Sequence, residues 1–539
     1  MPTSLEQVCA LEQAVARIKR GERLEAAALI GLLGGQDAEG RATANLVLAL
    51  AYVEVGDHPG ARPFIERAFV LSGGSRKVLP LFVQIHRAVG DFRAIRAARK
   101  RVGILAAEAG DVARALEDFN AWHYTDSEGR GEDRYEYDLD ILSAVRRLAE
   151  QHRRPVRPIA PLPGRRLRVA HLLFGTTQFN SVIVRISRLL AQFHDRSRFE
   201  MAFFAPESHA EVCRSLQGVG HLSFLQGQGC SVHAAPDLEK STDRLLWVAD
   251  AIRAFAPDLL VLNAALADFH HYFLLQLRPA PATLGFISGP PPQFAPPDLD
   301  WGIAWTWHPL MDAPFSCSHV PLETHLPDVG AVSLRPRTSL GIPEDAVVLG
   351  SAGRHVKHRS PGQWALVLSL LHSFPAARFL CVGAREDQLP EVGPMLAPFR
   401  DRIHFVPWIE NYLEVFGQAD IVLDTFPSGG GVALLDSMAL GKPVVTFAND
   451  YGKPFDQTDW TPAQEFMPEC DLVVPRGDEA RYLEVAGRLI ADAAYRRAMG
   501  ERCRQTVFGR LGSPERMVRR CEDVFEMLIR SKAGLLADA

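Results

Sequence analysis

The chain is poor in the features that mark secreted, membrane-spanning and metal-binding proteins. Its eight cysteines are scattered through 539 residues without a C-x-x-C pair, which argues against a disulfide framework and against a zinc site. No uncharged apolar run reaches about 18 residues, and the N-terminus lacks a basic segment followed by an apolar core. The sequence therefore predicts a cytoplasmic protein whose thiols lie in its core and which has no membrane partner.

An excess of charge of one sign is also lacking. Lys+Arg number 59 and Asp+Glu number 64, so the net charge is -5, and no long basic run interrupts this balance. A general nucleic-acid binder is therefore disfavoured, and a small or neutral partner fits better. What the chain does have is hydrophobic content, at 47%, enough to bury several cores. Its length predicts about three domains.

The first 150 residues are rich in alanine, leucine and arginine, with apolar residues at helical spacing. A short element recurs in them, and its glycines are Gly21, Gly56, Gly90 and Gly110. The first three glycines are 35 and 34 residues apart, and the fourth follows 20 residues later. In the best copy, small or aromatic residues suited to close helix packing are Ala49, Tyr52, Ala61 and Ala68. The pattern resembles tetratricopeptide repeats and predicts a helical repeat domain over 1–150; coincidental spacing in an ordinary helical domain is the alternative.

A proline- and arginine-rich linker, residues 151–166, separates this region from a different pattern. Short apolar runs then alternate with helical stretches, as expected for parallel strands covered by helices on both faces. Eleven runs are too many for one small sheet, so we expect two doubly wound α/β domains, over 167–337 and 338–539, with ligands at the carboxyl ends of the strands. The runs are 167–174, 199–206, 257–264, 282–288, 300–307, 346–352, 377–383, 403–407, 419–426, 443–447 and 471–475.

One of these strand ends carries three consecutive glycines, followed by a helical segment that begins at Val432. The first N–H groups of a helix are unpaired and its N-terminal end is positive, while glycine leaves room for a ligand. The turn therefore predicts an anion site, most naturally for phosphate, made by Ser428, Gly429, Gly430, Gly431 and Val432. A loop without a ligand is the alternative. No Lys-Ser/Thr pair follows, so the turn is not a P-loop.

Charged side chains near this turn extend the prediction to a nucleotide. Asp436 lies about one and a half turns into the helix, within an otherwise apolar segment, where it can reach a sugar hydroxyl of a bound nucleotide. Beyond the run 346–352, Arg354 and Lys357 concentrate positive charge that can hold a diphosphate and neutralise a departing nucleotide. Solvated loop cations are the alternative for the latter pair.

Residues 167 to about 530 resemble the catalytic region of the O-linked N-acetylglucosamine transferase group, glycosyltransferase family 41, which includes bacterial cytoplasmic protein N-glucosyltransferases. Helical repeats preceding such a region are usual in the family. The likeness is carried by LQLRPAPATLGFISGP, LGIPEDAVVLGSAGRHVKHRSP and GQADIVLDTFPSGGGVALLDSMALGKPVVTF. The resemblance implies a GT-B fold, in which two Rossmann-like domains face each other, the acceptor-side domain at 167–337 and the donor-binding domain at 338–539.

The resemblance also implies roles for individual residues. Lys357 falls on the family's phosphate-contacting lysine, and Arg354 falls on a polar nucleotide contact. Asp436 falls on the ribose-binding aspartate, and the stretch from Gly429 to Val432 falls on the phosphate-binding turn. Asp250 lies near an aspartate proposed as the family's base, although an acid on a helix surface is at least as good a reading. No metal and no further cofactor are implied.

Two departures from the family pattern concern the donor turn and the acceptor side. Where relatives carry Asn-Gly-His-Thr-Thr, this chain has Gly-Gly-Gly-Val-Ala, so phosphate binding must rest on backbone amides and on Arg354 and Lys357. Asn180 and Ser181 stand where relatives have a histidine near the acceptor. These departures leave the acceptor and the sugar open.

These features predict an inverting, metal-independent protein glycosyltransferase. It would move GlcNAc or a hexose from UDP-GlcNAc or UDP-Glc to Ser, Thr or Asn side chains of a bacterial protein, such as a flagellin or an adhesin, held by the helical repeats. One alternative is a flagellin glycosyltransferase that uses a CMP-activated nonulosonic acid, which suits the basic loop. Another is a binding scaffold that lost catalysis together with its turn residues. No nucleic-acid partner is expected.

Five other positions are weaker candidates. His270 and His271 follow a strand, but the polarity of a helix start explains them adequately. Asp298 and Asp300 resemble the metal-binding acid pair of other glycosyltransferases, but they stand in a proline-rich loop. Trp408 follows a strand and could stack on a base, although we expect it to be buried.

Overall fold

The computed structural model of the chain forms two compact units. The first contains Met1–Arg153, Lys240–Thr242 and Asp268–Leu277, and the second contains Arg154–Glu239, Asp243–Ala267 and Arg278–Ala539. The structure describes residues 4–24, 37–125, 138–176, 182–263, 268–287, 297–306, 315–323, 332–390, 392–409, 411–450, 460–467 and 470–534. Asn180 and Ser181 lie outside the described residues.

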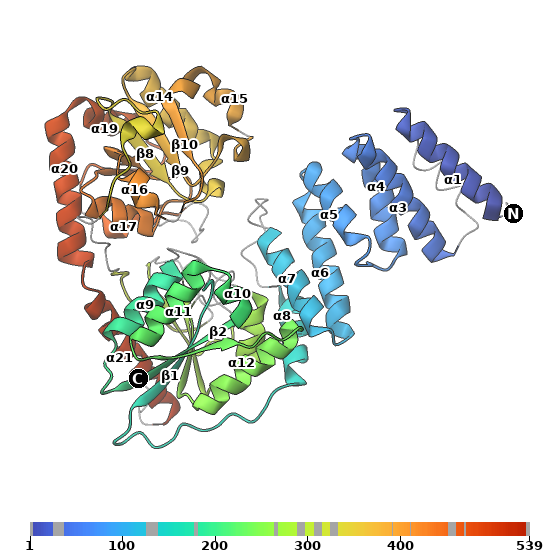
Figure 1. Cartoon of the computed structure of the whole chain (residues 1–539), viewed down its shortest axis with the longest axis horizontal. Helices are drawn as coiled ribbons and strands as arrows, with labels where there is room; N and C mark the ends of the chain where they lie inside the picture. Colours follow the sequence, from blue (N-terminus) through green and yellow to red (C-terminus); the bar gives the residue numbers. More distant parts are fainter. Residues whose placement is uncertain are drawn as a thin grey trace. The chain divides into compact units, whose positions relative to one another are not determined.

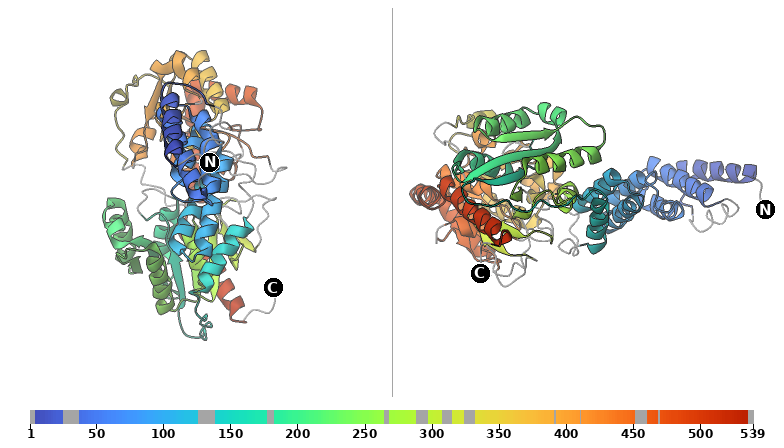
Figure 2. Two further views of the ribbon diagram at one scale, coloured as in Figure 1. Left: turned by 90° about the vertical axis from the view of Figure 1, so that its right-hand side faces the viewer. Right: turned by 90° about the horizontal axis from the view of Figure 1, so that it is seen from below.

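The first unit is a series of helices in which neighbours along the chain pack together (Figure 1), and Figure 2 gives two further views of them. Its helices are α1 (Ser4–Lys19), α3 (Ala38–Glu54), α4 (His58–Leu71), α5 (Leu79–Ala88), α6 (Phe92–Glu108), α7 (Val112–Thr125), α8 (Leu139–Glu150) and α13 (Phe269–Gln276). None of the helices described in either unit is long and apolar enough to cross a lipid bilayer.

The predicted glycines lie at the turns between these helices. Gly56 and Gly90 adopt left-handed backbone conformations, with φ of 78° and 76°, which glycine adopts without steric cost. An aspartate follows each glycine and caps the next helix: Asp57 accepts from the N–H of Gly60, and Asp91 accepts from the N–H of Ala94. A glycine that ends one helix and an aspartate that begins the next therefore explain the recurring element.

The small and aromatic residues of the best copy lie at the helix contacts. Ala49, Tyr52, Ala61 and Ala68 are all buried, and the ring of Tyr52 stacks on Phe64 at 5.5 Å. The predicted helical packing of this region is therefore confirmed, while its assignment as tetratricopeptide repeats stays a prediction.

The second unit contains two parallel sheets. The first has the order β3-β2-β1-β4-β5-β6-β7 and the second has the order β10-β9-β8-β11-β12-β13. The first-sheet strands are β1 (Leu167–Leu172), β2 (Phe199–Ser208), β3 (Ser231–Ala235), β4 (Leu259–Leu262), β5 (Ala282–Ile287), β6 (Trp301–Ala304) and β7 (Cys317–His319). The second-sheet strands are β8 (Val348–Ala352), β9 (Arg378–Val382), β10 (Ile403–Val406), β11 (Ile421–Leu423), β12 (Val444–Phe447) and β13 (Val473–Val474).

Helices connect the strands of each sheet (Figure 1). Those after β1, β2 and β3 are α9 (Val182–Phe193), α10 (His209–Cys213), α11 (Leu216–Gly227) and α12 (Ser241–Phe255). Those of the second sheet are α14 (Pro361–Ser373), α15 (Gly393–Leu396), α16 (Tyr412–Phe416), α17 (Val432–Ala439) and α18 (Ala463–Phe466). Two further helices, α19 (Glu479–Ala491) and α20 (Ala493–Thr506), follow its last strand. The predicted fold class, two doubly wound α/β sheets preceded by a helical region, is confirmed.

Each of the eleven predicted apolar runs contains a strand, but two strands were not predicted. They are β3 and β7, which form the two edges of the first sheet. An edge strand is covered on fewer sides than a central one, so it needs no continuous apolar run. The exposure of these strands agrees: in β3 only Ala235 is fully buried, and no residue of β7 is.

The last helix, α21 (Pro514–Lys532), returns to the first sheet although its residues fall in the predicted second domain (Figures 1 and 2). It packs against α9 and β5, and its Phe525 contacts the ring of His171 at 6.0 Å. Arg198, just before β2, donates to Glu526 at 2.5 Å. The chain therefore crosses between the two sheets once before β8 and again before α21.

Candidate functional site

The site predicted from the sequence lies at the carboxyl edge of the second sheet, where β8 and β11 are neighbours. β8 leads into a short 3-10 helix, His355–His358, and β11 leads through the three glycines into α17. The Nζ of Lys357 donates a hydrogen bond to the carbonyl oxygen of Gly429. The structure therefore joins the basic loop and the glycine turn.

The glycine turn is held by Asp424, which directly follows β11. Its carboxylate accepts hydrogen bonds from the N–H of Gly430 at 2.7 Å and from the hydroxyls of Thr446 and Thr461, each at 2.8 Å. Burial raises the pKa of the Asp424 carboxyl group, and these hydrogen bonds oppose the rise. Because a buried carboxylate is tolerated only when its oxygens are paired, the three donors fix the position of the turn.

The three glycines differ in their surroundings. A Cβ on Gly429 would meet the Oγ1 of Thr461 at 2.2 Å and a carboxylate oxygen of Asp424 at 2.7 Å, so this position has no room for a side chain. A Cβ on Gly430 would come within 3.2 Å of Leu434. At Gly431, which is the N-cap of α17, a Cβ would meet nothing within 4 Å. Gly429 is therefore required by packing within the protein, and Gly431 faces the open space at the helix end.

Alanine substitutions separate these two roles. We expect Gly429→Ala to lower the free energy of unfolding by about 1–3 kcal/mol, because Thr461 and Asp424 must move to admit the methyl group. Gly431→Ala should leave stability within about 0.5 kcal/mol and instead weaken UDP binding, since its methyl group projects where a phosphate would approach. Denaturant melts and calorimetric titration with UDP measure both effects. Equal stability of the two variants would contradict this reading of the turn.

Lys357 is a half-buried cation beside the turn. Burial lowers the pKa of its ammonium group to about 8, Arg354 acts in the same direction, and the negative charge of Asp424 opposes the shift. Arg354 is exposed, and its carbonyl oxygen accepts from the N–H of Lys357 at 2.9 Å. The two cations therefore belong to one loop, and Lys357 is close to losing its charge at mildly alkaline pH.

Asp436 is fully buried and already has partners. Its carboxylate accepts bidentate hydrogen bonds from Arg185 of α9, at 3.0 and 2.9 Å, and a third hydrogen bond from the hydroxyl of Tyr412 of α16. Burial raises the pKa of the Tyr412 phenol, and the charge of Asp436 raises it further, so this hydroxyl is a neutral donor. The predicted ribose contact is therefore occupied by protein groups in this structure.

Two further predicted turn residues lie with the site, and Asp250 does not. Ser428 and Val432 are half-buried at the two ends of the glycine turn, and the carbonyl oxygen of Ser428 accepts from the hydroxyl of Thr425 at 2.6 Å. Asp250 lies on α12 of the first sheet, 42% exposed, and its carboxylate pairs with Arg154 and Arg253 at 3.0 and 2.9 Å. These two arginines link it to the linker and to its own helix rather than to the donor edge.

Three of the weaker candidates belong to elements other than the second sheet. His270 is bonded to Asn120 at 2.9 Å, and the backbone N–H of His271 to Asp268 at 2.8 Å, both within the helical unit. Asp300 accepts from Thr283 and Lys532. In the part of the chain that the structure describes, no three His, Cys, Asp or Glu side chains gather as a metal site. The expectation that no metal is needed stays a prediction.

We expected Trp408 and the cysteines to be buried, and this expectation was partly wrong. Trp408 is 62% exposed, because it follows β10, the edge strand of the second sheet. Of the cysteines, four are buried and two, Cys9 and Cys213, are exposed. A local apolar context thus predicted burial poorly at the edges of the fold.

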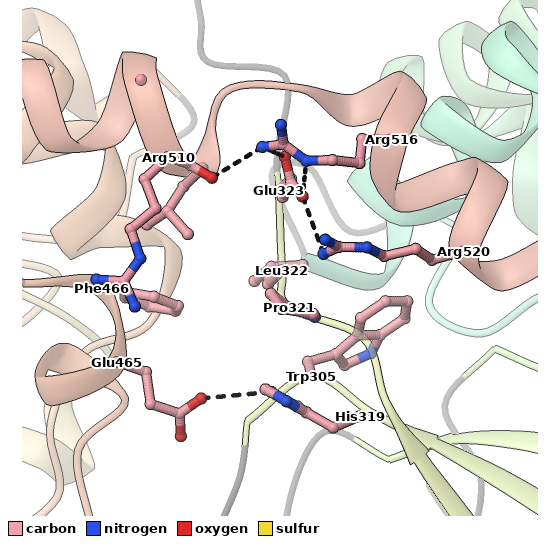
Figure 3. Close-up of a pocket in the computed structure, with 12 residues that line it drawn as sticks. Trp305, His319, Pro321, Leu322, Glu323, Glu465, Phe466, Arg510, Arg516 and Arg520 are labelled. Atoms are coloured by element: carbon pink, nitrogen blue, oxygen red, sulfur yellow. Dashed lines mark hydrogen bonds and ion pairs between the residues drawn. The ribbon is translucent and has the colours of Figure 1, made fainter.

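A cavity of about 590 Å³ lies where the chain crosses between the sheets. Figure 3 shows Arg510 and Phe466 on one side of it and Leu322 and Trp305 on the other. At one end, the buried carboxylate of Glu323 accepts from Arg516 at 2.8 and 2.5 Å and from Arg520 at 3.4 Å; at the other, His319 and Glu465 lie 3.6 Å apart (Figure 3). The volume is in the range of small-molecule sites. The cavity therefore adds a second candidate space within this unit.

Sequence reasoning missed the residues that support the site. Asp424, Thr446 and Thr461 hold the turn, and Arg185 and Tyr412 hold Asp436. Asp424 carried a signal, since it is an acid at the end of an apolar strand and directly before a glycine turn. The others carried none, because their roles arise from contacts between distant segments.

Comparisons with known proteins found matches that include both sheets. Residues 347–492 match the family model described as Glycosyl transferases group 1. A mutant of the Thermobaculum terrenum O-GlcNAc transferase is similar over 100% of both chains, with a TM-score of 0.57 and 17% identity. A glycosyltransferase from Rickettsia africae ESF-5 aligns over 68% of this chain and 99% of its own, with a TM-score of 0.49 and 12% identity. The comparison with curated protein sequences found no match.

The family match runs from β8 to the end of α19, so it contains both strand-end loops of the site. The full-length structural match gives the fold of the whole chain. The match of this region to a glycosyltransferase model implies a nucleotide-sugar donor. The chain therefore has a GT-B fold like that of the Thermobaculum terrenum O-GlcNAc transferase mutant, and its residues 347–492 match a glycosyltransferase domain model, which supports a glycosyltransferase.

Proposed function

We propose that this protein transfers GlcNAc or a hexose from a UDP-sugar to Ser, Thr or Asn side chains of an acceptor protein, with inversion and without a metal ion. The observation that carries the proposal is the bond from Lys357 to the carbonyl of Gly429, which joins a cation to the glycine turn beside an uncapped helix end. Unpaired helix N–H groups and a nearby ammonium group are suited to a diphosphate.

The donor contacts follow from this arrangement. The N–H of Gly431 lies at the turn, while that of Gly430 donates to Asp424 and shapes the turn from within. Lys357 and Arg354 supply positive charge, and Asp436 lies further along α17, where a ribose would follow the diphosphate. Positive groups fixed before the reaction stabilise charge that develops on the leaving group, which is the work a metal ion performs in other enzymes. The absence of His and Thr side chains from the turn makes this chain more dependent on Lys357.

In the proposed reaction, the acceptor oxygen or nitrogen forms a bond to the anomeric carbon on the face opposite the diphosphate. The bond between that carbon and the diphosphate oxygen breaks, the nucleotide leaves with the bonding electron pair, and the acceptor proton passes to a base or to solvent. Positioning of the two reactants accounts for much of the rate. The helices of the first unit would hold the acceptor, a flagellin- or adhesin-type protein, and raise its local concentration.

The test is the intact mass of a candidate acceptor co-expressed with the enzyme. We expect an added mass of one N-acetylhexosamine or one hexose, which reports both transfer and sugar. Addition of a nonulosonic acid would instead support a CMP-linked donor at the same site. Tandem mass spectrometry of the modified peptide then identifies the linked residue.

A second candidate function is a binding scaffold without catalysis. It is favoured by Asp436, which is fully buried and bonded to Arg185 and Tyr412 instead of being open to a ribose. In that case no nucleotide raises the melting temperature, and a partner co-purifies through residues 1–150. A melting-temperature rise with UDP would rule against it.

A further inference from the structure

The contact between Arg185 and Asp436 links the two sheets of the second unit. Arg185 extends from α9, which follows β1 of the first sheet, and Asp436 belongs to α17, which follows β11 of the second. The arginine side chain is 16% exposed and the aspartate side chain is 0% exposed. A buried, two-pronged arginine–carboxylate pair of this kind is strong and has defined geometry.

The pair leaves little room for another ligand on Asp436. A carboxylate has about four lone-pair sites for hydrogen bonds. Arg185 occupies one site on each oxygen, and Tyr412 occupies the second site on Oδ2. One site remains, on Oδ1. A ribose diol donates two hydroxyl groups, so it cannot bind this carboxylate in two-pronged fashion while Arg185 stays.

The position of Asp436 along α17 is suitable for contact with a ribose. It stands five positions beyond Gly431, which corresponds to about 7.5 Å along the helix axis. A nucleotide whose diphosphate sits on the glycine turn would bring its ribose to this part of α17. Arg185 and the ribose therefore require the same carboxylate oxygens.

We propose that Arg185 competes with the ribose diol of the donor for Asp436, so that nucleotide binding releases α9 from α17. The inference rests on the proposed function, since it assumes a donor with a ribose on α17. Removing the partner from a buried charge is costly, so Arg185 leaves only when the ribose hydroxyls replace it.

Release of Arg185 would act on the acceptor side. Because α9 packs against α11 and α21, a change in its position is transmitted within the first sheet. By linkage, whatever favours separation of α9 from α17 must favour nucleotide binding to the same extent. An acceptor that moves α9 would therefore raise donor affinity, so that transfer to protein is favoured over hydrolysis of the donor by water.

The test compares Arg185→Gln with Arg188→Gln. Arg188 lies one turn further along α9 and donates to His221 at 3.3 Å, so its variant removes a guanidinium group from the same helix without touching Asp436. Calorimetric titration with UDP should give about tenfold tighter binding to Arg185→Gln than to the natural protein, because the competitor is gone. Arg188→Gln should bind UDP as the natural protein does.

A second probe isolates the ribose hydroxyls. The diphosphate of 2′,3′-dideoxyuridine lacks both, so Arg185→Gln and the natural protein should bind it equally. In hydrogen–deuterium exchange, UDP should raise exchange of α9 in the natural protein but not in Arg185→Gln. Arg185→Lys keeps the positive charge and loses the bidentate geometry, so it should give an intermediate UDP affinity. This variant replaces Arg185→Gln in the comparison if the glutamine variant does not fold.

The outcomes separate this inference from the proposed function. If the natural protein binds UDP and Arg185→Gln binds it equally or more weakly, Arg185 is a structural or direct donor contact and the competition is overturned. If UDP binds only once Arg185 is removed, the competition is supported strongly. If no protein binds UDP and none transfers sugar, the proposed donor is wrong and the competition falls with it.

Discussion

Lys357→Met is expected to lower kcat/KM for sugar transfer by about 100- to 1000-fold, because a charge-stabilising group beside the leaving diphosphate is lost. The methionine side chain is close in size to that of lysine and lacks only the cation and its bond to the carbonyl of Gly429. Affinity for UDP should weaken less, about tenfold. Release of UDP from the donor, measured with a coupled assay, gives the first quantity, and calorimetry gives the second.

The pH profile distinguishes a catalytic cation from a structural one. Burial lowers the pKa of Lys357 to about 8, so the ammonium form predominates below that pH and is lost above it. For the natural enzyme kcat/KM should therefore fall as pH rises through about 8, since this parameter reports groups of the free enzyme. Lys357→Met should lack that fall. Retention of more than a tenth of the natural kcat/KM in this variant would remove Lys357 from the proposed chemistry.

The pairing of Lys357 with the glycine turn could be predicted because each part rests on local signals. Central parallel strands are recognised in the sequence as continuous apolar runs. The carboxyl ends of neighbouring parallel strands lie at one edge of the sheet, so the loops after β8 and β11 lie close together. The same logic failed at β3 and β7. Those edge strands carry polar and half-exposed residues, which local hydrophobicity does not distinguish from loops.

Asp436 illustrates what local sequence leaves open. An acid within an apolar helix predicts a partner, and the structure supplies Arg185 and Tyr412. Arg185 is 251 residues away in the sequence, so the pairing depends on how the two sheets face each other. The three glycines are a similar case. They are equivalent in the sequence, and only the folded positions of Thr461 and Asp424 make Gly429 intolerant of a side chain.

Asp424→Ala is expected to have the largest effect on the turn. Removal of the carboxylate leaves the N–H of Gly430 and the hydroxyls of Thr446 and Thr461 without their acceptor. Since each buried donor left unpaired costs about 1–3 kcal/mol, the free energy of unfolding should fall by about 3 kcal/mol or more, and UDP binding should be lost. Asp424→Asn keeps one acceptor oxygen and should retain part of both. Denaturant melts and calorimetric titration report the two effects.

Asp420→Ala is the matched control for a local effect. Asp420 accepts from Arg337 at 2.9 Å and from the N–H of Val348 at 2.8 Å, so it stabilises the start of β8 at the opposite end of the same sheet. Its loss should lower the stability of the second sheet while the glycine turn keeps its three bonds to Asp424. UDP affinity should therefore survive in Asp420→Ala at temperatures well below its melting point. If both variants lose UDP binding in proportion to their loss of stability, Asp424 acts on the fold as a whole and does not position the phosphate site.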